Sequence, residues 1–142
     1  MLFQRVNRED AERVFSIVYN IAGATVTAGY PVVLDVTAPD GVRVSKPATA
    51  TLSLLLGLAV ADITDSSYGK IQVYGYKASG WVYPNQTTAI AAGDILIPVD
   101  SSWHLTRSSA GNGLSGLIMA AESYATMTTS ITAQKKVFIR AL

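Results

Sequence analysis

The chain has 142 residues, and its 11 Lys and Arg against 10 Asp and Glu give a formal net charge of +1. This length suits one domain with an ordinary core, and the near-neutral balance argues against binding nucleic acid or anionic lipid through bulk charge. The chain contains no cysteine, which excludes disulfides, thiolate nucleophiles and Cys-type zinc sites.

The first segment, residues 1–13, is dense in charges of both signs. Asn7 followed by acidic residues is typical of a helix start, so we expect a short helix or an extended arm. No apolar stretch precedes a small-residue cleavage site, so no secretion signal is predicted. We expect the arm to contact a partner or a neighbouring subunit through apolar side chains and forked arginine hydrogen bonds. These candidate contact residues are Leu2, Phe3, Arg5, Val6, Arg8 and Arg13.

Residues 14–142 are expected to form a single domain that folds without the arm. In the first run, one face holds Phe15, Ile17, Tyr19 and Ile21, and the other face includes Ser16 and Asn20. This alternation predicts a strand. Turn residues at 28–31 and 38–41 predict further strands at 32–36 and 42–44. Polar residues and glycines interrupt the uncharged stretch 14–34, so it is not predicted to span a membrane.

The middle of the chain continues the β pattern. Residues 52–63 are apolar on both faces, which favours a buried strand or strand pair broken at Gly57, with a short helix left open. Residues 70–76 alternate, with Ile71 and Val73 predicted inward and Gln72 outward. Lys77-Ala-Ser-Gly80 predicts a hairpin turn into a strand at 81–83.

Further apolar pairs lie at 95–97, 103–105, 117–121 and 137–139. Together these runs predict an all-β fold, a compact β-barrel or sandwich of about ten short strands.

The stretch 89–116 holds the chain's single histidine and a G-x-G-x-x-G match at Gly111, Gly113 and Gly116. A dinucleotide site would need a preceding strand, a following helix and an acidic residue about 20 positions later. Lys135 and Lys136 stand at that position, so we interpret the glycines as a loop.

His104 lies near Asp100 and Ser102 in sequence, but such close neighbours on one strand do not converge as a catalytic triad. The sequence has no second histidine and no cluster of carboxylates, so it predicts no metal site. Asn85-Gln-Thr87 matches a glycosylation sequon, which we interpret as a turn. We therefore predict no enzymatic activity, no cofactor and no metal.

Four segments together carry a family resemblance. They are Gly69-Lys-Ile-Gln-Val-Tyr-Gly75, Ala91-Ala-Gly-Asp-Ile-Leu-Ile-Pro98, Gly116-Leu-Ile-Met-Ala-Ala-Glu122 and Lys136-Val-Phe-Ile-Arg140. Their order resembles the capsid decoration, or cement, proteins of tailed bacteriophages. Residues 28–33 and 56–60 look like the opening strands of that family.

The resemblance implies a non-enzymatic virion protein, often trimeric, that binds the major capsid protein on the capsid exterior and stabilises the head. It would be made in the cytoplasm of the bacterial host. Charged residues make up only 15% of the chain, against about a quarter in ordinary soluble domains, so we expect a homotrimer or another closed cyclic oligomer that covers apolar surface. Two alternatives stay open: a head-fibre or tail barrel, and a carbohydrate-binding β-sandwich that uses Trp81 and Trp103 as stacking platforms.

Overall fold

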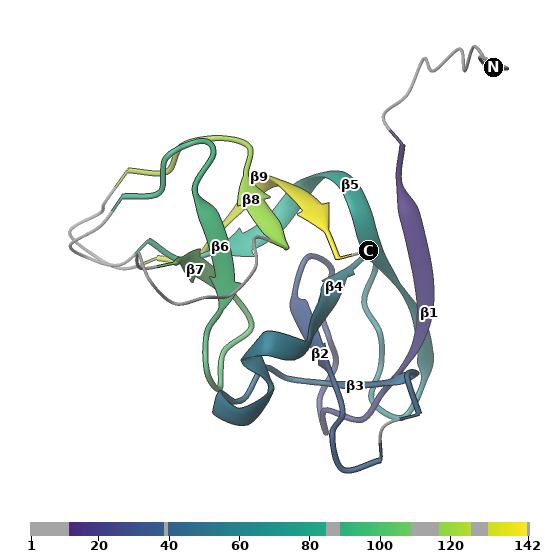
Figure 1. Ribbon diagram of the computed structural model, residues 1–142. Coiled ribbons are helices and arrows are strands. Elements are labelled where there is room, and N and C mark those ends of the chain that lie inside the picture. The colour runs from purple at the N-terminus through teal and green to yellow at the C-terminus, as the bar shows by residue number, and fades with distance from the viewer. Residues whose placement is uncertain (1–11, 39, 85–88, 109–116, 126–130, 142) are drawn as a thin grey trace, which may run out of the picture.

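The computed structural model describes residues 12–38, 40–84, 89–108, 117–125 and 131–141. Within these ranges the chain forms nine strands and one short 3-10 helix (Figure 1), which confirms the predicted all-β class. In chain order they are β1 (Val14–Asn20), β2 (Pro31–Leu34), β3 (Arg43–Ser45), the 3-10 helix η1 (Thr49–Leu54), β4 (Leu55–Ala59), β5 (Tyr68–Val82), β6 (Ile95–Pro98), β7 (Leu105–Arg107), β8 (Ile118–Ala120) and β9 (Ala133–Arg140).

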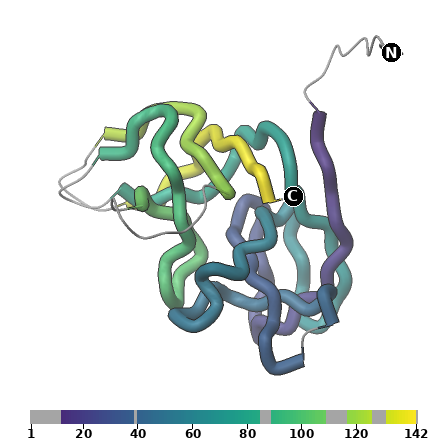
Figure 2. The backbone as a smooth tube through the Cα atoms, in the orientation of Figure 1, coloured from purple at the N-terminus to yellow at the C-terminus, as the bar shows by residue number. Residues whose placement is uncertain are grey.

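Strand pairing closes two rings that share β5. The first ring runs β1-β3-β2-β4-β5 and closes through β1–β5, and the second runs β5-β7-β6-β8-β9 and closes through β5–β9. Figures 1 and 2 show the two groups of strands side by side, with β5 passing through both. Ring closure leaves few free strand edges, because each strand finds neighbours around the barrel.

Each ring packs its own group of buried side chains. The first ring encloses Val18, Val26, Val32, Val44, Ala59, Ile63, Ile71 and Val73. The second encloses Val82, Ile90, Leu96, Leu105, Ile118, Ala120, Tyr124, Val137 and Ile139, and Leu55 and Leu58 of β4 join this cluster from the first ring. Small branched side chains dominate the first cluster, as expected where five short strands leave little interior volume.

The hairpin predicted at residues 77–80 is wrong. Residues 68–82 form one continuous strand, and a register shift between Lys77 and Gly80 in its pairing with β9 absorbs the glycine. A Cβ at Gly80 would lie 2.9 Å from Val137 Cγ2 and 3.2 Å from Leu58 Cδ1. The glycine therefore serves close packing of β5 against its neighbours and does not mark a turn.

The expected outward orientation of Gln72 is also wrong. Its side chain is buried, and its Nε2 donates to the carbonyl oxygens of Tyr74 at 3.1 Å and Tyr76 at 3.0 Å. β5 is covered on both faces in this part, so the residue cannot reach solvent. Its amide is accommodated because it hydrogen-bonds to backbone acceptors of the same strand.

The run predicted at 52–63 divides into two elements. Its first part belongs to η1, where the Thr51 hydroxyl donates to the Ala48 carbonyl at 3.1 Å and accepts from the Ala48 amide at 3.1 Å. The strand β4 then begins at Leu55. Periodicity alone did not distinguish a strand from a short helix in this run, and the structure contains one of each.

β1 is half-buried, as its alternation predicts, but its inner face is the less apolar one. Val18 and Asn20 are fully buried, whereas Phe15 and Ile17 are exposed. Asn20 Nδ2 donates to the carbonyls of Ala24 and Ile63, both at 2.9 Å, and its Oδ1 accepts from the Ala22 amide at 2.9 Å. Because these bonds satisfy the buried amide, the strand can turn its larger apolar side chains outward.

Candidate functional site

Several exposed apolar side chains of the described residues lie along β1 and the start of β5. We define the β1 face as Phe15, Ile17, Tyr19, Ile21 and Tyr68. Phe15 is 41% exposed, Ile17 59% and Tyr68 70%. Tyr19 and Tyr68 meet edge to face with ring centroids 4.9 Å apart, and Lys70 Nζ lies 4.9 Å from the centroid of Phe15. Large exposed apolar side chains gathered on one face are typical of a protein interaction surface.

Beside this face runs a backbone edge that we call the open edge, residues Val14–Val18. Here β1 pairs with β5 on one side, while on the other side β3 pairs only with Tyr19 and Asn20. The backbone N–H of Asn20 donates to the Ser67 carbonyl on the β5 side, and the backbone N–H of Tyr19 donates to the Val42 carbonyl on the β3 side. Since backbone groups alternate along a strand, those of Phe15 and Ile17 point to the open edge. Within the described part of the chain, no strand pairs with them there.

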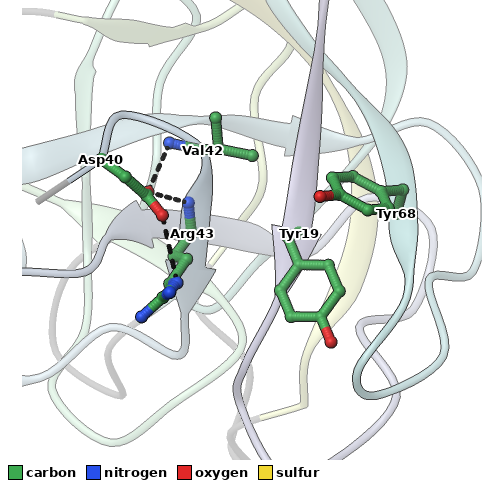
Figure 3. A pocket seen from close by; sticks show the side chains of 5 residues that line it. All are labelled: Tyr19, Asp40, Val42, Arg43 and Tyr68. Carbon is green, nitrogen blue, oxygen red and sulfur yellow. Dashed lines mark hydrogen bonds and ion pairs between the residues drawn. The ribbon is translucent and has the colours of Figure 1, made fainter. Parts of the chain in front are cut away.

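A pocket opens at the point where β3 meets this edge. We call it the tyrosine pocket; it has a volume of about 420 Å³ and is lined by Tyr19, Asp40, Val42, Arg43 and Tyr68 (Figure 3). Arg43 Nε lies 3.1 Å from Asp40 Oδ2. The pocket thus combines two aromatic rings with one ion pair, a setting suited to a charged side chain with an apolar stem.

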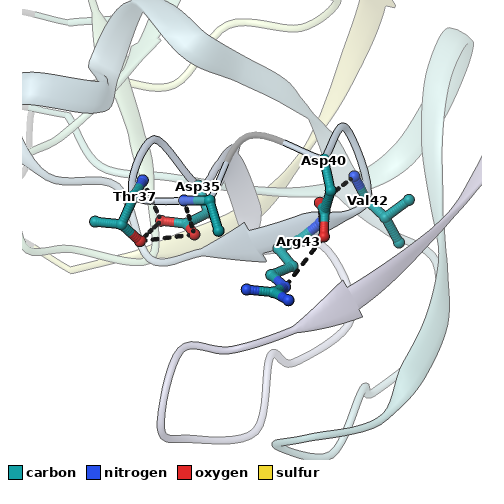
Figure 4. Close-up of polar contacts among 6 residues, drawn as sticks. Asp35, Thr37, Asp40, Val42 and Arg43 are labelled. Carbon is teal, nitrogen blue, oxygen red and sulfur yellow. Dashed lines mark hydrogen bonds and ion pairs between the residues drawn. The ribbon is translucent and has the colours of Figure 1, made fainter.

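Two aspartates shape the turn that carries this pocket (Figure 4). Asp40 Oδ1 accepts from the amides of Val42 and Arg43, both at 2.9 Å. Asp35 accepts from the amide of Thr37 at 3.1 Å and from its hydroxyl at 2.8 Å. Backbone donors lower the pKa of both carboxyls, with the Arg43 amide the largest cause for Asp40 and the Thr37 amide the largest for Asp35. Both side chains are therefore carboxylates at neutral pH.

A second pocket gathers both tryptophans of the chain and Tyr30. This aromatic pocket has a volume of about 350 Å³ and is lined by Tyr30, Trp81, Ser102, Trp103, His104 and Thr132. Tyr30 stacks on Trp103 with centroids 5.2 Å apart, and Lys46 Nζ lies 5.6 Å from the Trp103 centroid. Trp81 Nε1 donates to the Ala28 carbonyl at 3.0 Å. The structure thus brings the two tryptophans of the carbohydrate alternative to one pocket, but Trp103 already has Tyr30 and Lys46 as neighbours.

His104 lies at the rim of the aromatic pocket. Its ring packs against Tyr83 with centroids 4.8 Å apart, and its carbonyl accepts from the Val99 amide at 3.3 Å. Burial, and then the positive charge of Lys46, lower the pKa of His104 from the ordinary 6.5. These contacts describe a neutral imidazole packed against an aromatic ring.

We expect His104 to titrate below 6.5 in the folded protein. Because the unfolded chain then binds the proton more tightly, the free energy of unfolding should fall as the pH drops through 6.5 towards the folded pKa. The imidazole NMR signals of this single histidine report the midpoint directly, and His104→Gln should remove its contribution to the pH dependence. A midpoint above 6.5 would contradict the packing described here.

Only one of the six candidate contact residues of the arm lies within the described residues. Arg13 is exposed and directly precedes β1. The others, Leu2, Phe3, Arg5, Val6 and Arg8, lie outside the described residues, as do Gly111, Gly113, Gly116 and the sequon at 85–87. Sequence reasoning missed Tyr68, Asp40 and Arg43, which reach the end of β1 only through strand pairing. The apolar odd positions of β1 were the one local signal of this surface.

Two structural features are absent from the described residues. No group of three or more His, Asp or Glu side chains is arranged there to hold a metal ion. No helix there has the length and apolar character needed to cross a membrane.

Comparisons with known proteins give a match among solved structures only. No protein-family model matches the chain, and no curated protein matches its sequence. Among solved structures, the chain is similar to the N base of the head fibre gp8.5 of bacteriophage phi29. The two chains share 16% sequence identity with a TM-score of 0.49, over 87% of this chain and 94% of that chain.

Proposed function

We propose that this protein is a non-enzymatic structural protein of a bacteriophage virion that binds the exterior of the capsid and stabilises the head. The β1 face carries the proposal, because it presents Phe15, Ile17 and Tyr68 to solvent on a chain with few charged residues. An apolar surface of this kind favours stable association with another protein.

The placement of the family-like segments supports the proposal. Residues 69–75 lie in β5, residues 91–98 lead into β6, residues 116–122 include β8 and residues 136–140 lie in β9. The turn before β6 has the expected geometry, since Asp94 Oδ2 accepts from the Ala91 amide at 2.7 Å. β6, β8, β9 and β5 are consecutive neighbours in the second ring. The resembling segments therefore make up one continuous part of the barrel.

The proposed partner is the major capsid protein of the same virus. We propose that the β1 face makes this contact, that the arm at residues 1–13 adds to it, and that the protein acts as a closed oligomer without a cofactor. A head-fibre or tail position would use the same face on a different virion partner.

Replacing Ile17 by Glu should weaken binding to capsids at least tenfold, because a charge then interrupts the centre of the β1 face. Folding should be retained, since Lys70 is the cross-strand partner of residue 17 and can pair with the new carboxylate. The measurement is the occupancy of purified heads that lack the protein, after titration with the purified chain.

Ile95→Glu is the matched control, because Ile95 is also an exposed isoleucine in a strand, at 38%, but lies in β6 of the second ring. Equal binding by both variants would exclude the β1 face as the capsid contact. Absence of binding by the unaltered chain, together with localisation to tails or fibres in purified virions, would replace capsid decoration with the alternative virion position. Dose-dependent binding to a glycan array would favour the carbohydrate alternative.

A further inference from the structure

We propose that the open edge of β1 pairs with the same edge of a second copy of this chain, antiparallel about a two-fold axis at Ser16. The inference rests on the geometry of β1 and the tyrosine pocket, and it does not depend on the proposed function.

The backbone of the open edge provides the first step. Phe15 and Ile17 direct their N–H and C=O groups away from β5, towards the side where β3 ends. An antiparallel second copy centred on Ser16 places its Ile17 opposite Phe15, and its Phe15 opposite Ile17. Each such pair exchanges two N–H to C=O hydrogen bonds. Every donor and acceptor that the open edge presents at these two residues is thereby used.

The side chains of the open edge are self-complementary. Val14-Phe-Ser-Ile-Val18 has the same pattern of apolar and polar residues in both directions around Ser16. Pairing about Ser16 therefore sets Phe15 beside Ile17 on the outer face and Val14 beside Val18 on the inner face. Natural strand edges that must stay unpaired usually carry charges or proline, and residues 14–18 have neither.

The tyrosine pocket explains where the second copy leaves the sheet. β3 already holds the position beside Tyr19, so the second copy's chain must turn out of the sheet at its Arg13, the residue that would come opposite Tyr19. Val14 of the second copy is the last residue that can pair, so its Arg13 leaves the sheet next to Tyr19, which lines the tyrosine pocket. The second copy's Arg13 thus comes close to the two tyrosine rings and to the Asp40 carboxylate.

Charges at this point are complementary. Within one copy, Arg13 forms no ion pair in the described residues, and its positive charge adds to burial in lowering the pKa of Lys77. In the pair, Arg13 moves next to Asp40, so that opposite charges meet at each end.

A second copy fits this edge better than an unrelated strand does, because a two-fold contact requires each copy to supply the same surface to the other. Two features meet that condition: the apolar pattern is symmetric about Ser16, and Arg13 of each copy fits the tyrosine pocket of the other. A three-fold ring joins two different surfaces, so it would not use the self-complementarity of this edge.

Disulfide cross-linking tests the pairing. Because the chain contains no cysteine, an introduced cysteine is its only thiol. At the two-fold axis, Ser16 faces Ser16 of the second copy as a non-hydrogen-bonded pair, with a Cα separation of about 4.5 Å, which a disulfide can bridge. The full-length Ser16→Cys variant should therefore form a disulfide-linked dimer under mild oxidation. Val14→Cys tests the register, because Val14 faces Val18, and Ser53→Cys, an exposed position in η1, reports random collisions. Both controls should cross-link at least tenfold more slowly.

Equal cross-linking rates for the three cysteine variants would overturn the proposal, as would preferential cross-linking of Val14→Cys. The unaltered chain provides an independent measurement, with an expected mass of two chains by sedimentation at high concentration. Arg13→Ala should weaken this dimer about fivefold, in line with a partly exposed ion pair. A mass of one chain or of three chains at all concentrations would also overturn the two-fold pairing, and neither result would exclude binding to capsids.

Discussion

Replacing Gly29 by Ala is expected to lower the free energy of unfolding by about 3 kcal/mol or more, or to prevent folding. Gly29 has φ +87, and a Cβ there would collide with the backbone carbonyl of Ser79 and lie 3.0 Å from Trp81 Cδ1. Its amide donates to the Ala59 carbonyl at 2.8 Å, and its own carbonyl accepts from the Trp81 amide at 3.2 Å. The turn cannot move away without breaking its bonds to β4 and β5.

Gly93→Ala is the matched control for this experiment. Gly93 has φ +94, but a Cβ there would meet nothing within 4 Å. Its substitution therefore measures backbone strain alone, about 1 kcal/mol. Denaturant unfolding of both variants gives the difference between the two losses, which is the cost of the collision. Equal losses would show that the contact of Gly29 with β5 is looser than the structure indicates.

The second large effect is expected for Asn20→Ala, with a loss of about 3 kcal/mol in the free energy of unfolding. The substitution removes three hydrogen bonds and leaves the carbonyls of Ala24 and Ile63 and the amide of Ala22 without this partner. An unsatisfied buried polar group costs about 1–3 kcal/mol, so the combined loss exceeds that of an ordinary surface change.

Gln134→Ala removes an exposed amide from β9 and serves as the control, with an expected change within about 0.5 kcal/mol. The measurement is again denaturant unfolding, with the slope compared between variants to confirm that the same surface is exposed. A loss below about 1 kcal/mol for Asn20→Ala would mean that water or a rearranged turn replaces the side chain.

The accuracy of the sequence predictions depended on how local their signals were. Strands β2 and β6 lie where turn residues and short apolar runs predicted them. The predicted hairpin at 77–80 failed because the glycine signal has two physical origins, a turn or a close approach of another strand. Only the position of Val137 beside Gly80 distinguishes them, and that residue is far along the chain.

The candidate surfaces followed the same division. The alternation of β1 was visible in the sequence, but which face is buried depended on partners for Asn20 that come from the turn at residues 22–24 and from Ile63. The tyrosine pocket joins β1, β3 and the start of β5, and no spacing rule connects these residues. The sequence singled out His104 and Trp81 as separate candidates, but it did not predict that they line the same pocket.

By itself the sequence determined the all-β class, because β-branched residues, short alternating runs and frequent turns leave no long apolar helix to build. It also determined the low charge that leaves apolar surface exposed on one chain. Only the tertiary structure decided that β5 serves two rings, that β1 turns Phe15 and Ile17 outward, and that an edge of β1 stays open beside the tyrosine pocket. The physical reason is that burial and hydrogen-bond satisfaction are properties of contacts between distant segments, whereas periodicity reports only how one segment alternates.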